Sequence, residues 1–131
     1  MDNKALIFVI DDDKLVHRLM NCVLKALSLD NVRNFYSGEE CLAHMDKEPQ
    51  FVFLDFEMRG KNGLQILKAI KLKYPHTKVV MVSGQRKREI VVKTLENGAD
   101  DYFVKDNNLA LTLKDYLFRH LNGLSVQHNM V

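Results

Sequence analysis

The chain has 131 residues, of which 47% are hydrophobic and 27% charged, a composition typical of one globular domain and unlike that of a disordered protein. No apolar run approaches the roughly 20 residues that a membrane-spanning helix needs, and the amino-terminal residues lead directly into an apolar segment rather than a signal peptide. We therefore expect a cytoplasmic protein with no membrane association. The net charge of +2 comes from 19 basic and 17 acidic residues scattered along the chain, which argues against direct nucleic-acid binding.

The first predicted strand, residues 6–10, is entirely apolar and runs into three consecutive acids, Asp11, Asp12 and Asp13. An uninterrupted apolar strand is typical of a parallel sheet that is covered on both faces. Aspartate is a good helix N-cap, but a cap needs one residue and three are present. A helical pattern begins at residue 14. The residues on its apolar face are Leu15, Leu19, Val23 and Leu27.

A short strand is predicted at residues 32–36, followed by a helix to residue 47 that opens with the S-x-x-E spacing of a capping box. Pro49 ends that helix. The strand at residues 51–54 is again uninterrupted and apolar, and it leads into Asp55. After a loop rich in glycine and charge, Asn62 is positioned to cap the next helix. The inward-facing residues of that helix are Leu64, Leu67, Ile70 and Tyr74.

The last part of the chain continues the alternation. A strand at residues 78–82 ends at Ser83, a helix at residues 87–97 ends at the C-cap residue Gly98, and a strand at residues 101–104 runs into Lys105. The final helix spans residues 109–121, and residues 122–131 form a polar tail or the start of a linker. Five strands alternating with five helices predict an α/β domain over residues 1–121, with a doubly wound five-stranded parallel sheet and helices on both faces.

The two cysteines, Cys22 and Cys41, lie in segments with a helical pattern and lack the CxxC spacing of metal or redox sites. Free cysteine packs as a small hydrophobic residue. We therefore expect both to be buried thiols.

Polar residues follow four of the predicted strands. The carboxyl ends of parallel strands share one edge of the sheet, where open α/β sheets bind their ligands. The residues expected to converge there are Asp11, Asp12, Asp55, Ser83 and Lys105. Three carboxylates would repel by roughly 4 kcal/mol per pair at about 4 Å with an effective dielectric near 20, so the site calls for a cation.

The ligands on offer at this edge are oxygens, with no histidine or cysteine among them. Such a donor set suits Mg²⁺, or Mn²⁺ in its place. Lys105 adds a positive charge and Ser83 a hydrogen-bond donor. The pocket can therefore hold a phosphoryl group while one carboxylate acts as the nucleophile.

Four motifs, in this order and at this spacing, resemble the receiver domain of two-component response regulators over residues 5–121. They are Ile10-Asp11-Asp12-Asp13 after the first strand, Leu54-Asp55 with Met58 and Gly63-Leu64 after the third, Val82-Ser83-Gly84 after the fourth, and Gly98-Ala99-Asp100-Asp101-Tyr102-Phe103-Val104-Lys105 across the fifth. Each motif is weak alone, but together they are strong. The resemblance implies the flavodoxin-like topology of receiver domains.

The resemblance also implies roles for the site residues. Asp55 would accept a phosphoryl group from the phosphohistidine of a sensor histidine kinase or a phosphotransfer protein. Asp11, Asp12 and Asp55 would hold the Mg²⁺ ion together with the backbone carbonyl of Glu57, and Lys105 would contact the phosphate. The protein would be a regulatory phosphoacceptor rather than an enzyme, one that assists its own phosphorylation and dephosphorylation.

Four further positions match residues that control signalling in the family. Ser83 and Tyr102 match the switch residues, whose movement shifts the surface formed by the fourth helix, the fifth strand and the fifth helix. Glu57 and Gln85 match positions that tune hydrolysis of the acyl phosphate. The implied protein is a monomer or a weak dimer through that surface, and its downstream output protein or domain is unknown.

Two residues depart from the family pattern. Arg59 and Asp106 stand where receivers commonly have proline. A non-proline cis bond costs about 2.5–4 kcal/mol, so we expect the Lys105–Asp106 bond to be trans and the following loop to be rearranged. Asp106 can also draw Lys105 away from the phosphate.

Two other classes of protein stay open. Asp55-Phe56-Glu57 is faintly similar to the paired acids of haloacid-dehalogenase-type phosphatases, although Met58 and Arg59 differ from their pattern and the chain is short for that fold. The second alternative is a receiver-like interaction module that is not phosphorylated in the usual way.

Overall fold

The computed structural model describes residues 4–60 and 62–121. Its elements are β1 (Ile7–Ile10), α1 (Lys14–Ala26), β2 (Val32–Phe35), α2 (Gly38–Ala43), the 3-10 turn η1 (Met45–Lys47), β3 (Phe51–Leu54), α3 (Gly63–Lys73), β4 (Lys78–Ser83), α4 (Arg88–Glu96), β5 (Asp101–Val104) and α5 (Leu109–His120). The predicted alternation is confirmed. The second helix is shorter than expected and continues as η1. The predicted tail at 122–131 lies outside the described residues.

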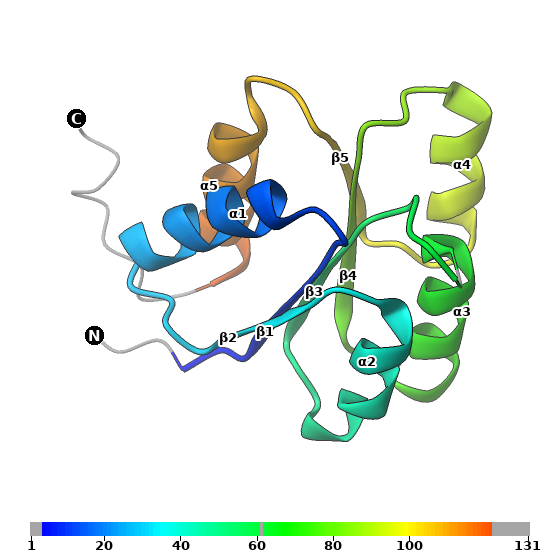
Figure 1. The fold of residues 1–131 in the computed structure, drawn as a ribbon, viewed down its shortest axis with the longest axis horizontal. Helices are drawn as coiled ribbons and strands as arrows, with labels where there is room; N and C mark the ends of the chain where they lie inside the picture. Colours follow the sequence, from blue (N-terminus) through cyan, green and yellow to red (C-terminus); the bar gives the residue numbers. More distant parts are fainter. Residues whose placement is uncertain (1–3, 61, 122–131) are drawn as a thin grey trace.

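The five strands form one parallel sheet in the order β2-β1-β3-β4-β5. This is the flavodoxin-like order, in which the strand sequence reverses beside β1 and β3. Figure 1 shows α1 and α5 on one side of the sheet and α2, α3 and α4 on the other. None of the helices in the described part of the chain is both long and apolar enough to cross a membrane.

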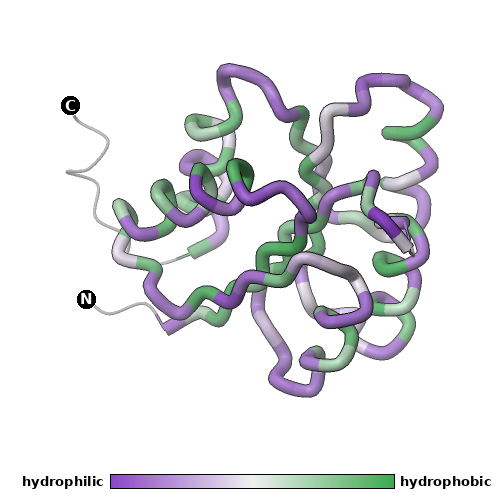
Figure 2. The backbone as a smooth tube through the Cα atoms, in the orientation of Figure 1, coloured by the Kyte–Doolittle hydropathy of each residue, from purple (hydrophilic) through white to green (hydrophobic). Residues whose placement is uncertain are grey.

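The central strands are buried on both faces, as their uninterrupted apolar runs predict. Phe51 and Phe53 of β3 pack into the cluster under α1 and α5, and Val52 and Leu54 pack into the cluster under α2 and α3. Figure 2 shows the hydrophobic residues gathered along these strands and hydrophilic residues in the β4–α4 and β5–α5 loops. Burial of each such side chain stabilises the fold by about 1.5–3 kcal/mol, which holds the strand ends in a fixed arrangement.

The predicted apolar face of α1 is half wrong. Leu15 and Leu19 are 70% and 41% exposed, whereas Val23 and Leu27 are buried. Steps of four residues in a helix of 3.6 residues per turn drift by about 40° each, so Leu15 lies about 80° around the axis from Val23. The positions within α1 that face the core are His17, Met20, Val23 and Leu24.

The cysteine prediction is confirmed for one residue and wrong for the other. Cys41 is fully buried in the cluster under α2 and α3, and burial raises the pKa of its thiol to about 12. Cys22 is exposed, because it lies on the outer side of α1.

Candidate functional site

Two buried acids meet at the carboxyl edge of the sheet. Asp11 follows β1 and Asp55 follows β3, and these strands are neighbours with Ile10 paired to Leu54. The Asp55 N–H donates to the Ile10 carbonyl at 2.9 Å, which continues the ladder by one residue. Carboxylate oxygens of Asp11, Asp12 and Asp55 lie within 4.8 Å of one another. The predicted convergence of these three acids is therefore confirmed.

Asp13 has a different task from the two acids before it. Its Oδ1 accepts the Leu15 N–H at 2.9 Å, so it is the N-cap of α1. Its own N–H donates to Asp11 Oδ1 at 2.9 Å. The run of three acids thus divides into two carboxylates for the site and one cap that also orients Asp11.

Lys105 reaches into the acid cluster from the end of β5. Its Nζ lies 2.8 Å from Asp11 Oδ2 and 3.3 Å from Asp55 Oδ1. Asp106 lies 3.7 Å from Arg86 instead, across the β4–α4 and β5–α5 loops. The expectation that Asp106 draws Lys105 away is therefore wrong, since the two buried acids hold the ammonium. The described residues contain no cis peptide bond, as expected for Lys105–Asp106.

The charges of the site are out of balance. Burial and the nearby Asp11 carboxylate raise the pKa of Asp55 to about 6, even though Lys105 and the Glu57 N–H oppose the rise. Burial lowers the pKa of Lys105, but its bonds to Asp11 and Asp55 outweigh this effect, so the net pKa is raised. The single ammonium of Lys105 does not neutralise the carboxylates of the three aspartates, and an additional cation would relieve the repulsion between them. The oxygen-only donor set fits Mg²⁺ or Mn²⁺.

Ser83 and Tyr102 are linked through the β4–α4 loop. Ser83 is 1% exposed, and its Oγ accepts the Gln85 N–H at 3.1 Å. The Tyr102 hydroxyl donates to the Gln85 carbonyl at 2.8 Å. The side-chain oxygen of Gln85 accepts the N–H groups of Arg86 and Lys87 at 3.1 Å each, so this amide holds the main chain that leads into α4. Its predicted effect on hydrolysis stays a prediction.

Glu57 lies in the loop after β3 with its side chain exposed. Its N–H donates to Asp55 Oδ1 at 3.3 Å, which orients the carboxylate. The ligand role predicted for its carbonyl, like its effect on hydrolysis, stays a prediction.

Two residues support the site in ways that the sequence did not indicate: Gly63 was matched only as part of a motif, and His17 was not identified. Gly63, the first residue of α3, donates its N–H to the Phe56 carbonyl at 2.8 Å, and a Cβ there would overlap the Asp55 carbonyl. His17, in the second turn of α1, is buried and bonds the Asp11 carbonyl. The available signal for His17 was its place three residues before Met20 and seven before Leu24, which puts it on the same face of the helix as these two apolar residues.

This fold and this site define a class: flavodoxin-like α/β proteins with an acidic ligand site at the carboxyl edge of the sheet. A profile of the family described as "Response regulator receiver domain" matches residues 7–116. The chain belongs to this family, and the family is a regulatory one.

Individual relatives agree with the assignment. The chain is 30% identical over 120 residues to "Chemotaxis protein CheY-3" of Vibrio cholerae, covering 89% of this chain and 92% of that protein. It is 28% identical to "DNA-binding transcriptional regulator NtrC" of Escherichia coli, of which it spans 25%. The solved structure "BeF3 Activated DrrB Receiver Domain" superposes with a TM-score of 0.80 at 32% identity, covering 89% of this chain and 97% of that one.

Proposed function

We propose that this receiver domain accepts a phosphoryl group on Asp55 from the phosphohistidine of a sensor kinase or a phosphotransfer protein in the cytoplasm. The carrying observation is the position of Asp55: it is 5% exposed, carboxylate oxygens of Asp11 and Asp12 lie within 4.8 Å of one of its own, and Lys105 Nζ lies at 3.3 Å. A nucleophilic carboxylate needs an approach for the donor and positive charge for the transferred oxygens. Lys105 supplies the positive charge, and the place of Asp55 at the carboxyl edge of the sheet supplies the approach.

In this reaction an Asp55 oxygen attacks phosphorus, the phosphorus–nitrogen bond of the donor breaks, and a phosphorus–oxygen bond to Asp55 forms. Lys105 then binds a phosphoryl oxygen in place of the Asp55 carboxylate. Asp11 and Asp12 would hold a Mg²⁺ or Mn²⁺ ion with Asp55 and the Glu57 carbonyl. The ion supplies charge that neutralises the phosphoryl oxygens.

The response would be a population shift. Ser83 is buried at the end of β4, and its hydroxyl can donate to a phosphoryl oxygen while still accepting from the Gln85 N–H. A movement of the β4–α4 loop would displace Tyr102, because its hydroxyl donates to the Gln85 carbonyl in that loop. The surface of α4, β5 and α5 then favours a second arrangement, which an output partner or a second copy of the chain recognises.

The exposed leucines of α1 support a docking surface for the phosphodonor. Leu15 and Leu19 line a shallow cavity together with Lys105, Asp106 and Leu109, beside the acid cluster. A donor protein that packs on these side chains would bring its phosphohistidine to Asp55. Leu15→Ala and Leu19→Ala should therefore slow transfer from a kinase and leave phosphorylation by acetyl phosphate unchanged.

The direct test uses acetyl phosphate or beryllium fluoride with Mg²⁺. Mass spectrometry should detect one added phosphoryl group after acetyl phosphate, and the amide NMR spectrum should change with beryllium fluoride. Asp55→Ala should abolish both results. Asp30→Asn is the control, because this exposed acid precedes β2 at the opposite edge of the sheet.

The alternatives predict different results in the same samples. Unchanged mass and unchanged spectra in the folded wild-type protein would favour an interaction module that is not phosphorylated. Release of phosphate from a generic phosphate ester in proportion to time would favour a phosphatase of the haloacid dehalogenase type. The family assignment favours the regulatory phosphoacceptor over both.

A further inference from the structure

His17 is a buried polar residue on α1 whose ring nitrogens pair with a main-chain oxygen and an asparagine oxygen rather than with the carboxylate groups of the site. Its side chain is 3% exposed, and its Nε2 lies 2.7 Å from the main-chain carbonyl oxygen of Asp11. A carbonyl oxygen can only accept a hydrogen bond, so Nε2 donates it. The ring therefore acts on the main chain that carries two of the acids, Asp11 and Asp12.

Three polar atoms of Asp11 are hydrogen-bonded and the fourth, Oδ2, is in an ion pair, and each contact comes from a different part of the fold. Its N–H donates to the Phe35 carbonyl at 3.1 Å, Oδ1 accepts the Asp13 N–H at 2.9 Å, and Oδ2 lies 2.8 Å from Lys105 Nζ. The remaining atom, the carbonyl oxygen, is bonded to His17. Among the described residues, His17 is the only side chain that bonds the main chain of Asp11.

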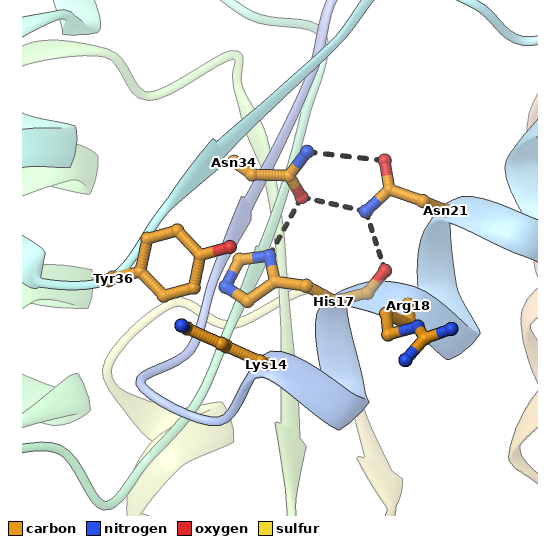
Figure 3. Close-up of a pocket in the computed structure, with 6 residues that line it drawn as sticks. All are labelled: Lys14, His17, Arg18, Asn21, Asn34 and Tyr36. Atoms are coloured by element: carbon orange, nitrogen blue, oxygen red, sulfur yellow. Dashed lines mark hydrogen bonds between the residues drawn. The ribbon is translucent and has the colours of Figure 1, made fainter.

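The His17 ring contacts one asparagine and one tyrosine, and a second asparagine bonds both that asparagine and the main chain of His17, as Figure 3 shows. Nδ1 lies 2.7 Å from Asn34 Oδ1, and the Tyr36 ring packs against the imidazole with its centroid at 4.4 Å. Asn21 Nδ2 donates to Asn34 Oδ1 at 2.7 Å and to the His17 carbonyl at 2.6 Å, and Asn34 Nδ2 donates back to Asn21 Oδ1 at 3.2 Å. The network thus joins α1 and the end of β2 to Asp11.

We propose that His17 is a positioning residue for the cation and phosphoryl site. It fixes the main chain between β1 and α1 so that the carboxylates of Asp11 and Asp12 stay directed at Asp55. This inference rests on the proposed function. Like charges at short distance favour a spread arrangement, and residues that orient metal ligands from behind typically contribute tenfold or more to metal affinity.

Two conservative substitutions separate positioning from general packing. Glutamine carries its amide nitrogen near the place of the imidazole Nε2, so His17→Gln can still donate to the Asp11 carbonyl. Asparagine is shorter and reaches only the place of Nδ1, so His17→Asn can bond Asn34 but not Asp11. Both variants lose the ring contact with Tyr36, and we expect similar losses of stability.

The measurement is the affinity for Mn²⁺, followed by the electron paramagnetic resonance signal of the free ion, with urea unfolding on the same samples. We expect His17→Gln to bind Mn²⁺ within about threefold of the wild-type protein and His17→Asn about tenfold more weakly. Asn34→Ala, which frees the far side of the ring without touching Asp11, should weaken binding by about threefold. It serves as the test if His17→Asn does not fold.

Three results would overturn the inference. Wild-type affinity in folded His17→Asn, or in Asn34→Ala where that variant has to serve, would show that the Asp11 main chain needs no such support. Equal weakening in His17→Gln and His17→Asn would show that the role is packing rather than donation to the carbonyl. A wild-type protein that does not bind Mn²⁺ would overturn the proposed function first, and the inference with it.

Discussion

Replacement of Asp55 by asparagine should stabilise the metal-free protein at neutral pH. The carboxylate is 5% exposed, and burial together with Asp11 raises its pKa from 3.8 to about 6. The folded protein therefore holds the Asp55 proton more tightly than the unfolded chain does. The stability contributed by this group is fully present below pH 3.8 and is lost as the pH rises through about 6. Asparagine keeps the shape and has no charge to bury.

The magnitude follows from the difference between the two pKa values. A shift of about two units corresponds to about 3 kcal/mol. Integrated over pH, the advantage of Asp55→Asn over the wild-type protein should be about 1 kcal/mol at pH 4.5 and about 3 kcal/mol at pH 7.5. The rise of this stability advantage between pH 4.5 and pH 7.5 identifies ionisation as the cause, because a packing effect would be the same at both pH values.

The assay is urea unfolding in EDTA at several pH values between 4.5 and 7.5. Asp115→Asn is the matched control, since this carboxylate is 70% exposed on α5 and its removal should change stability little at any pH. Addition of Mg²⁺ at ten times its dissociation constant should stabilise the wild-type protein by about 1.4 kcal/mol. Asp55→Asn lacks one carboxylate ligand and should gain less stability from Mg²⁺. The difference in free energy of unfolding between this variant and the wild-type protein should therefore narrow.

Two results would refute this reasoning. No advantage for Asp55→Asn at pH 7.5 would mean that the fold does not oppose the charge at this position. An advantage of the same size at pH 4.5 and 7.5 would mean that the cause is packing or hydrogen bonding rather than ionisation.

Two further predictions concern residues at the site, and a third concerns a residue far from it. Lys105→Gln leaves two buried carboxylates without their ammonium and should lower the free energy of unfolding by about 3 kcal/mol at pH 7.5 in EDTA, measured with urea. Gly63→Ala puts a Cβ against the Asp55 carbonyl and 2.6 Å from the Cα of Phe56, so it should lower the free energy of unfolding by about 2 kcal/mol and weaken Mg²⁺ binding in calorimetry. Gly84→Ala is the control, because its Cβ meets nothing within 4 Å, and it should have neither effect. Asp100→Ala removes an ion pair at 2.8 Å and a bond to the β4 main chain at the opposite edge of the sheet, so thermal unfolding should show a loss of about 2 kcal/mol with Mg²⁺ affinity unchanged. Lost metal affinity in Asp100→Ala would contradict the independence of the two edges.

Much of the site could be predicted from the sequence because Asp11, Asp55 and Lys105 each directly follow an apolar strand. In a parallel sheet every strand ends at the same edge, so Asp11, Asp55 and Lys105 could be brought together without knowledge of the strand order. The choice of cation followed from the oxygen donors alone. The resemblance to receiver domains then supplied roles that the spacing did not contain.

Helix α1 shows where a local pattern fails. The apolar periodicity selected Leu15 and Leu19, which are exposed beside the site, and passed over His17, which is buried behind it. A polar residue in a core position is stable only when its hydrogen bonds are made. The partners of the His17 ring are Asp11, directly after β1, and Asn34 in β2. The sequence of α1 does not contain those partners.

The residues by themselves determined the alternation of strands and helices and the edge at which the chemistry gathers, because burial on both faces of a strand and one face of a helix is written in local periodicity. Tertiary structure decided which acid caps α1, that Lys105 pairs with Asp11 and Asp55 while Asp106 pairs with Arg86, and that His17 bonds Asp11. Each of these contacts joins side chains whose directions depend on the order of the strands and the packing of helices on them. They are set by the three-dimensional neighbours of each side chain, which no stretch of sequence specifies alone.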